Sequence, residues 1–256
     1  ARCRQLGRTD ICLIEDSCDT MTYTEESDIS VISFYASHVI TAGGGGGMVM
    51  CNSLKECEVG FAYRDWGRIG NNVEDPSERF GYKVDDISYD FKFLYGVKGY
   101  NFKATEMQAA FGLVQMKKLP DFTKKRRSLV ERYLQNLANT PYILPIDDGK
   151  FNWLAMPMLV PPHWDRKALL NYIECNGIQT RVFFAGNVTR HPAYREFYTP
   201  DDPYPNSDTI MRECFMIGAH HGLDLEDVDY VCDVLKKFDP AAEAAKSTLD
   251  PGACDL

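Results

Sequence analysis

The sequence lacks several features that would assign a protein class at once. No apolar run approaches the roughly 20 residues that a membrane-spanning helix requires, and the glycine-rich stretch lacks the Lys-Ser or Lys-Thr of a nucleotide-binding phosphate loop. Positive charge is also scarce, since 28 Lys and Arg residues against 37 Asp and Glu residues give a formal net charge of −9. This balance opposes capture of nucleic acids or anionic membranes, so we expect neither as a partner.

The nine cysteines form no metal-binding or secretory pattern. None is spaced from another as in Cys-x-x-Cys, and no secretory signal opens the chain. An odd count also fits poorly with a complete set of disulfide bonds. We therefore expect reduced thiols, a cytoplasmic location and no bound metal.

What is present is an ordinary globular composition, with 45% hydrophobic and 25% charged residues in a chain of 256 residues. The order of elements predicts an α/β fold, with a mainly parallel sheet domain over residues 1–138 and a small α+β domain over residues 139–238. A loose tail is expected over residues 239–256, and a Pro/Asp/Gly-rich connection marks the domain boundary. Because a strand follows a lead of only nine residues, we expect a fragment or a naturally shortened relative of an α/β enzyme.

Hydrophobic patterns place the elements of the first domain. Short apolar or β-branched runs predict three strands, over residues 11–15, 29–35 and 47–51, the first of them buried. Ser53 is expected to cap a helix reaching residue 66, and a long functional loop is expected over residues 67–100. Helical spacing then predicts two helices that Pro120 separates or kinks, the second ending at residue 138.

The second domain shows a similar alternation on a smaller scale. Strands are predicted over residues 153–160 and 178–184. Asp165 is expected to cap a helix that ends at residues 176–177, where Asn-Gly stops it. A final amphipathic helix is predicted over residues 223–238.

Polar side chains follow the first two predicted strands. Asp16, expected to be buried, ends the first, and Ser33 lies near the end of the second, followed by His38 and five glycines at residues 43–47. Open α/β sheets bind ligands at the carboxyl ends of their strands. There an aspartate can keep a pyridine nitrogen protonated, a serine can donate to a phosphate, and a histidine can transfer protons. Taken singly, each residue also fits a structural position, and the glycines favour a tight turn beside a ligand over a flexible linker.

Together these residues resemble one family. Asp16 in Ile-Glu-Asp, the Ser33-Phe34-Tyr35 run and the glycines are similar to the DegT/DnrJ/StrS-type sugar aminotransferases, which are fold-type I enzymes of pyridoxal 5′-phosphate (PLP). Residues 99–103 (Gly-Tyr-Asn-Phe-Lys) and 107–110 (Met-Gln-Ala-Ala) resemble that family's second signature. The resemblance implies an aspartate-aminotransferase-like fold whose large cofactor-binding domain is truncated.

In most of that family a lysine that binds PLP covalently follows the Ser-Phe signature, and here that position is His38. This exchange resembles the nucleotide-sugar 3-dehydrase subgroup, as does Arg-Asp-Trp-Gly-Arg at residues 64–68. The resemblance implies removal of the C3 hydroxyl of an NDP-4-keto-6-deoxyhexose, in deoxysugar or lipopolysaccharide biosynthesis. It also implies that the cofactor remains pyridoxamine 5′-phosphate (PMP), which glutamate regenerates.

The resemblance further implies roles for five residues. His38 would be the catalytic base, Asp16 would hold the pyridine nitrogen, and Ser33 would bind the phosphate. Asn101 would reach the phosphate of the neighbouring subunit's cofactor in a homodimer, and Arg181 would contact the nucleotide sugar. Judged alone, Asn101 also fits a helix cap and Arg181 also fits an ordinary strand edge.

Two other functions remain open at this point. One is a PLP-dependent sugar aminotransferase that uses Lys92 or Lys98, and the other is an inactive truncated relative that only dimerises or binds a nucleotide sugar. Some dehydrases carry a [2Fe–2S] cluster, whose cysteines would follow Arg-Asp-Trp-Gly-Arg. Residues 69–76 contain no cysteine, so we expect the cluster-free branch.

Overall fold

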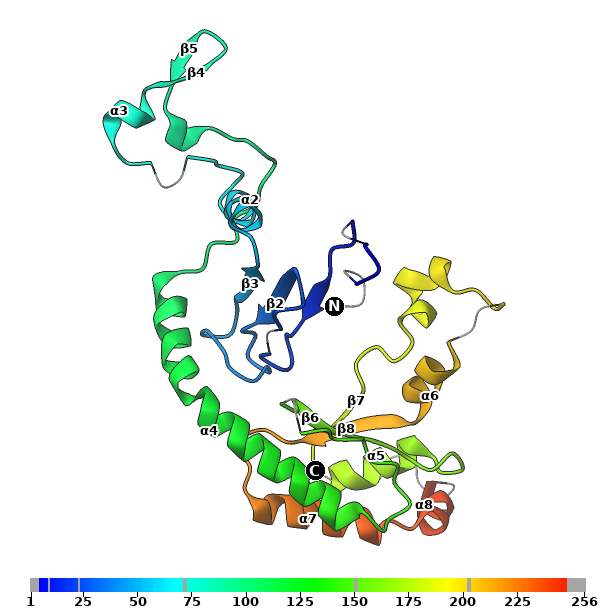
Figure 1. The fold of residues 1–256 in the computed structure, drawn as a ribbon. Coiled ribbons are helices and arrows are strands. Elements are labelled where there is room, and N and C mark those ends of the chain that lie inside the picture. The colour runs from blue at the N-terminus through cyan, green and yellow to red at the C-terminus, as the bar shows by residue number, and fades with distance from the viewer. Residues whose placement is uncertain are drawn as a thin grey trace. The chain divides into compact units, whose positions relative to one another are not determined.

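The structure is a computed structural model that describes residues 5–8, 10–22, 24–70, 73–149, 152–201 and 204–247. The chain divides into two compact units, residues 1–119 and residues 120–256. Each unit contains a three-stranded sheet together with helices (Figure 1). This mixture of helices and sheets is the α/β fold that the sequence predicts.

The first unit is built on β1 (Ile14–Asp16), β2 (Ile29–Ser33) and β3 (Gly47–Cys51). β2 lies in the middle, parallel to β1 and antiparallel to β3. The three predicted strands are therefore present, but the prediction of a mainly parallel sheet is wrong for the described residues, because one of the two pairings is antiparallel. The prediction that the first strand is buried is wrong, because β1 is an edge strand and 61% of Ile14 is exposed.

Ser53 caps α2 (Leu54–Arg64) as predicted, and its hydroxyl accepts a hydrogen bond from the backbone N–H of Glu56 at 3.2 Å. The long loop predicted after this helix contains four short elements, which are α3 (Pro76–Arg79), β4 (Tyr82–Val84), β5 (Ile87–Tyr89) and the 3₁₀ turn η1 (Phe91–Phe93). β4 and β5 form an antiparallel hairpin. The sequence did not predict it, because each strand is too short for an alternation of apolar and polar residues to be recognised.

A single long helix, α4 (Glu106–Leu137), replaces the two helices predicted on either side of Pro120. Proline in a helix removes one hydrogen bond and costs about 3 kcal/mol. The second half of α4 offsets this cost because it buries Leu129, Val130 and Tyr133 in the core of the second unit. For the same reason the boundary between the compact units falls at Pro120, earlier in the chain than the connection predicted at residues 139–149.

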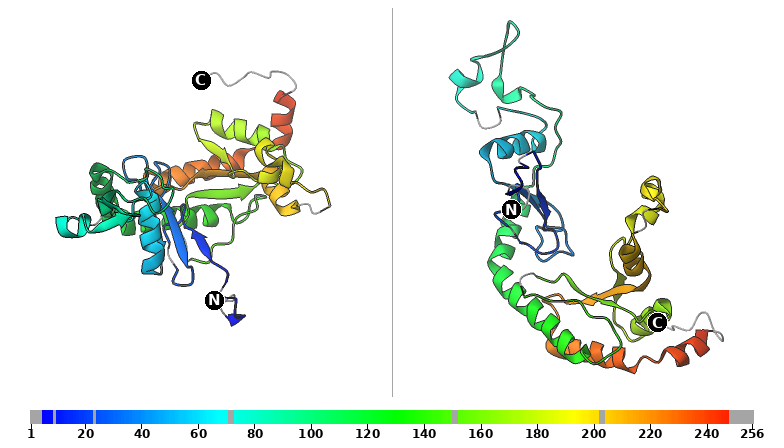
Figure 2. Two further views of the ribbon diagram at one scale, coloured as in Figure 1. Left: turned by 90° about the horizontal axis from the view of Figure 1, so that it is seen from above. Right: turned by 45° about the vertical axis from the view of Figure 1, so that its right-hand side comes forward.

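The second unit has an antiparallel sheet in the order β6 (Ala155–Leu159), β8 (Cys214–Gly218) and β7 (Thr180–Val182). Met156 pairs with Ile217 and Met158 with Phe215, and all four are buried, so these side chains share one face of the sheet. The second half of α4, α5 (Arg166–Cys175) and α7 (Leu225–Lys237) lie along the sheet (Figures 1 and 2) and supply the rest of the core.

The remaining elements of the second unit are η2 (Val188–Arg190), η3 (Pro192–Phe197), α6 (Pro205–Glu213) and α8 (Pro240–Ser247). The expectation of a loose tail after residue 238 is wrong for α8, because an alanine-rich segment that begins with proline favours a helix. Residues 248–256 lie outside the described residues.

Six of the cysteines in the described ranges are free thiols, whereas Cys175 is disulfide-bonded. The expectation of reduced thiols is therefore wrong for Cys175, which ends α5 and is exposed enough to meet another thiol. Cys3 and Cys254 lie outside the described residues.

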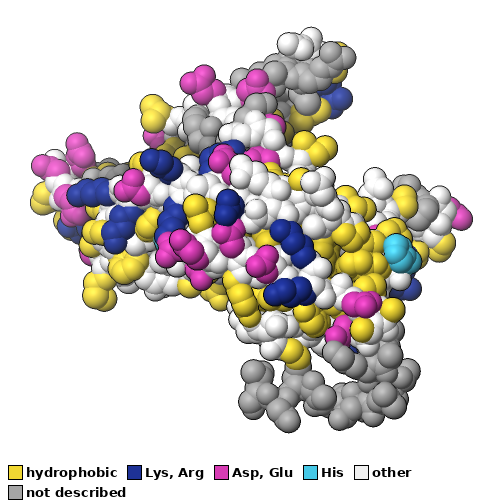
Figure 3. Space-filling model, turned by 90° about the horizontal axis from the view of Figure 1, so that it is seen from below, with side chains coloured by type: hydrophobic (Ala, Val, Ile, Leu, Met, Phe, Trp, Pro, Cys, Tyr) yellow, Lys and Arg dark blue, Asp and Glu magenta, His cyan; other side chains and the backbone are white. Residues whose placement is uncertain are grey.

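Charged side chains of both signs are interspersed on the surface shown in Figure 3. In the second unit, Lys125 pairs with Asp224 at 2.7 Å and Arg132 with Asp229 at 2.7 Å. None of the helices in the described ranges is long and apolar enough to cross a membrane.

Candidate functional site

Two of the predicted site residues end neighbouring parallel strands. Asp16 is the last residue of β1 and pairs with Val31 of β2, and Ser33 is the last residue of β2. Because the carboxyl ends of parallel strands lie at the same edge of a sheet, the segments that follow both strands meet there. A contact between Asp19, which follows β1, and His38, which follows β2, confirms that they do.

His38 is held between these two segments. Its Nδ1 atom lies 2.6 Å from Oδ1 of Asp19, and only 19% of the His38 side chain is exposed. Both atoms are shielded from solvent, and their alignment is not that of a hydrogen bond, so the two side chains are in close contact without one. A carboxylate beside Nδ1 favours the proton on that nitrogen, which leaves Nε2 as the nitrogen that can exchange a proton with a ligand.

Asp19 was not among the residues predicted from the sequence. It lies three residues after Asp16, in a turn where the backbone N–H of Met21 donates to the carbonyl of Ser17 at 3.0 Å. The sequence shows that Asp19 follows the first strand closely, but it does not show that Asp19 contacts a histidine 19 positions later. Only the parallel pairing of β1 with β2 brings the two together.

Asp16 is exposed, so the expectation of a buried carboxylate is wrong. The cause is the edge position of β1. Its Oδ1 accepts a hydrogen bond from the backbone N–H of Cys18 at 3.1 Å. Hydrogen bonds from the Cys18 thiol and from that N–H lower the pKa of Asp16, and the nearby His38 adds to the effect. Asp16 is therefore an ionised carboxylate at neutral pH.

Cys18 connects the two strand ends. Its thiol donates to Asp16, and the backbone N–H of Ser33 donates to its sulfur. Burial and the carboxylates of Asp16 and Asp19 raise the pKa of this thiol to about 11, so Cys18 is a neutral thiol at physiological pH.

Ser33 presents its hydroxyl at the same edge. The Oγ atom accepts a hydrogen bond from the backbone N–H of Tyr35 at 3.2 Å. A hydroxyl group that accepts from the backbone still has one proton to donate, so this group can bind an anion.

The glycine run forms a tight turn, as predicted, between this edge and β3. Gly43, Gly44 and Gly46 have φ angles of +68°, +94° and +96°, which favour glycine. Thr41 fixes the turn, because its hydroxyl donates to the carbonyl of Phe34 at 2.9 Å and accepts from the N–H of Gly44 at 2.9 Å.

Asn101 belongs to a second cluster in the first unit. It forms an isolated bridge with Asp65, and the N–H of Trp66 donates to the carbonyl of Tyr100 at 2.8 Å. The two signature segments, residues 64–68 and 99–103, are thus brought together, and the Asn101 side chain is exposed. Its predicted role toward a neighbouring subunit remains a prediction.

Arg181 lies in β7 and belongs to the second unit, whereas the other four predicted site residues belong to the first. It is exposed, and its Nη1 donates to the backbone carbonyl of Thr180 at 2.7 Å. Its predicted contact with a nucleotide sugar remains a prediction.

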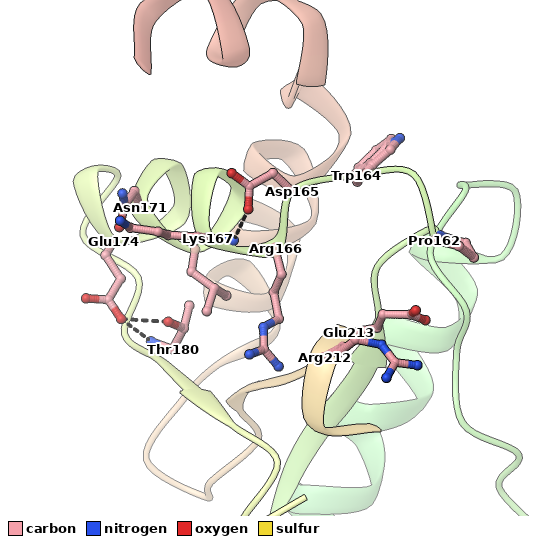
Figure 4. A pocket seen from close by; sticks show the side chains of 11 residues that line it. Pro162, Trp164, Asp165, Arg166, Lys167, Asn171, Glu174, Thr180, Arg212 and Glu213 are labelled. Atoms are coloured by element: carbon pink, nitrogen blue, oxygen red, sulfur yellow. Dashed lines mark hydrogen bonds between the residues drawn. The ribbon is translucent and has the colours of Figure 1, made fainter. Parts of the chain in front are cut away.

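A pocket of about 670 Å³ also lies in the second unit (Figure 4). None of the predicted site residues lines it. Glu174 accepts from the Thr180 hydroxyl at 2.6 Å, Asp165 caps α5, and Arg166 donates to backbone carbonyls of α6 and β8 at 2.8 and 2.9 Å. These side chains hold α5 against the sheet, and we assign the pocket no ligand.

The model of the DegT/DnrJ/EryC1/StrS aminotransferase family matches residues 5–236. The chain is 32% identical over 251 residues to a dTDP-4-dehydro-2,6-dideoxy-D-glucose 3-dehydratase of Saccharopolyspora spinosa, covering 90% of this chain and 54% of the relative. It is 31% identical over 255 residues to the lipopolysaccharide biosynthesis protein RfbH of Salmonella typhimurium, covering 92% of this chain and 58% of the relative. The chain thus spans little more than half the length of these curated relatives.

Among solved structures, the fold is similar to that of the E. coli GDP-4-keto-6-deoxy-D-mannose-3-dehydratase with bound hydrated PLP. The TM-score is 0.78 at 24% sequence identity, over 92% of this chain and 63% of that chain. At this identity the likeness establishes the fold alone.

Proposed function

The chain belongs to the DegT/DnrJ/EryC1/StrS aminotransferase family, and we propose that it acts as a PLP/PMP-dependent nucleotide-sugar 3-dehydrase. The reaction would remove the C3 hydroxyl of an NDP-4-keto-6-deoxyhexose in the cytoplasm, for deoxysugar or lipopolysaccharide biosynthesis. The name of the Saccharopolyspora spinosa relative, a 3-dehydratase, supports the reaction class. The observation that carries the proposal is the contact of His38 with Asp19 at the sheet edge that also presents Asp16.

The residues at this edge fit a pyridoxal-type cofactor. Asp16 is ionised, as a carboxylate that pairs with a protonated pyridine nitrogen must be, and it is exposed, so a cofactor can reach it. Ser33 retains a hydroxyl proton for the phosphate. The glycine turn at residues 43–47 keeps side chains away from the same edge.

PMP, when bound, supplies a primary amine for the C4 ketone and a ring that accepts electrons while the C3 hydroxyl departs. The chain's own residues perform the remaining tasks. His38 accepts and returns a proton through Nε2, while Asp19 stabilises the charged imidazolium and fixes its orientation. Asp16 holds the proton of the ring nitrogen, and Ser33 anchors the phosphate.

The partners follow from the same proposal. Glutamate regenerates the amine form of the cofactor, and a homodimer allows Asn101 to reach the phosphate bound by the neighbouring subunit. Arg181 contacts the nucleotide sugar. Lys92 is poorly suited to the alternative aminotransferase reaction, because its Nζ is already engaged by a carboxylate oxygen of Glu74 at 2.5 Å.

The test uses the purified chain with PMP and either a GDP- or a dTDP-linked 4-keto-6-deoxyhexose. We expect a 3-deoxy product by NMR and no lysine labelled after borohydride treatment in the presence of PLP. A labelled Lys92 or Lys98 together with an amino-sugar product would establish the aminotransferase instead. If neither product forms and the absorbance of PMP is unchanged by the chain, the chain is an inactive relative.

A further inference from the structure

The Arg-Asp-Trp-Gly-Arg segment, residues 64–68, has a tightly constrained backbone. Trp66 has a φ angle of +62°, which is unusual for a bulky side chain, and Gly67 follows at +89°. A Cβ atom on Gly67 would lie 1.9 Å from the carbonyl oxygen of Val97, and one on Gly99 would lie 2.1 Å from the nitrogen of Gly67. Backbone strain of this kind persists where the surrounding structure enforces it and is concentrated at ligand sites.

This backbone places Arg68 against three aromatic rings. The guanidinium carbon lies 4.9 Å from the ring centroid of Trp66, 4.9 Å from that of Phe93 and 5.9 Å from that of Tyr95. Its Nε atom is shielded from solvent and has no hydrogen-bond partner. By contrast, Arg64 forms two hydrogen bonds with the carboxylate of Asp65, at 2.7 and 2.8 Å.

The three aromatic residues are also partly exposed to solvent. Trp66 is 43% exposed, Phe93 41% and Tyr95 59%. A guanidinium carries five N–H donors, and Arg binds phosphates in a planar, two-pronged manner, so one orientated by aromatic rings is suited to an anion. Exposed rings beside it offer faces on which a nucleobase can stack, with about 1–3 kcal/mol for each stacked base.

We propose that Arg68, with Trp66 and Tyr95, binds a nucleoside diphosphate, the guanidinium holding the phosphates and the rings stacking on the base. The proposal rests on the proposed function, because it assigns a site to the nucleotide part of the substrate. The charge of the chain as a whole, −9, does not attract a nucleotide, so the local cation and rings must supply the binding.

The test is isothermal titration calorimetry of the full chain with GDP and with dTDP, without PMP and without sugar. Binding of the free nucleotides does not depend on catalysis, so a failed dehydrase assay would not refute nucleotide binding. Equally, an absence of nucleotide binding by Arg68 would not refute the dehydrase activity. Arg68→Gln keeps the length of the side chain and removes its charge. The matched control is Arg195→Gln, because Arg195 also lies over an aromatic ring, Tyr198 at 5.0 Å, but in the second unit.

We expect saturable binding that Arg68→Gln weakens by about 10- to 100-fold and that Arg195→Gln leaves unchanged. Inorganic phosphate alone should compete weakly, and nucleotide should quench Trp66 fluorescence, a signal lost in Trp66→Phe. If Arg68→Gln unfolds the first unit, Arg68→Lys provides the comparison, since it keeps the charge and loses the planar contact. Equal affinity in wild type and in both Arg68 variants overturns the proposal, as does an absence of nucleotide binding.

One further outcome also overturns it. If Arg68→Gln changes the sedimentation of the chain without changing nucleotide affinity, the aromatic surface is a contact between copies of the chain.

Discussion

Removing the charge of Asp19 is expected to slow the reaction without preventing folding. Asp19 Oδ1 lies 2.6 Å from His38 Nδ1, and the two side chains are 34% and 19% exposed, so solvent screens the contact only in part. When His38 carries a proton, a partly screened ion pair of this kind contributes about 1 kcal/mol. Because each 1.36 kcal/mol of activation free energy is tenfold in rate, Asp19→Asn should lower kcat by about fivefold.

The assay is the steady-state rate of 3-deoxy sugar formation as a function of the concentration of the sugar nucleotide. Because Asp19 acts through His38, its loss should lower kcat and leave KM little changed, which a disturbed binding site would not do. The matched control is Asp10→Asn, which removes the same charge from an exposed pair with Arg8. Unchanged kcat in Asp19→Asn, or an equal loss in Asp10→Asn, would refute the orientation of His38 by Asp19.

Three further predictions concern stability. Gly67→Ala should destabilise the first unit by about 2 kcal/mol or more, because its Cβ would meet the carbonyl oxygen of Val97 at 1.9 Å. The control Gly60→Ala, in α2 with open space around it, should instead stabilise the unit by about 0.5–1 kcal/mol, and urea unfolding measures both. Hydrogen bonds from Thr24, Ser17 and Ser27 lower the pKa of Glu15 from 4.5 to about 2. The first unit should therefore be most stable above pH 4.5 and lose stability as the pH falls toward 2. A Glu15→Gln variant whose stability has the same acid dependence would contradict this. Burial and the neighbouring Arg126 lower the pKa of His221 from 6.5, so the second unit should lose stability as the pH falls below 6.5, and thermal unfolding of His221→Phe should show a smaller loss.

Local signals in the sequence predicted the helices and strands whose first residues are set by a capping side chain or by a turn. Ser53 and Asp165 cap helices as expected, and β3 occupies residues 47–51 because the glycine turn defines where it begins. Features that depend on tertiary packing were not predicted. β8, the central strand of the second sheet, follows α6 directly, and no turn residue separates them.

The site shows the same division. The order of Asp16, Ser33 and His38 along the chain was enough to predict that they share one edge of the sheet, because that conclusion needs only the positions of strand ends. The pairing of His38 with Asp19 and the exposure of Asp16 could not be predicted, because both depend on the register of β1 against β2 and on the edge position of β1.

The central claim is that His38 transfers the proton in a dehydration reaction, and it is tested most directly by single-turnover formation of the 3-deoxy product in His38→Asn. With PMP and a 4-keto-6-deoxy sugar nucleotide, the wild-type chain should form this product and His38→Asn should form none. The control His163→Asn, at an exposed histidine of the second unit, should match the wild type. Product formed by His38→Asn at the wild-type rate would contradict the account.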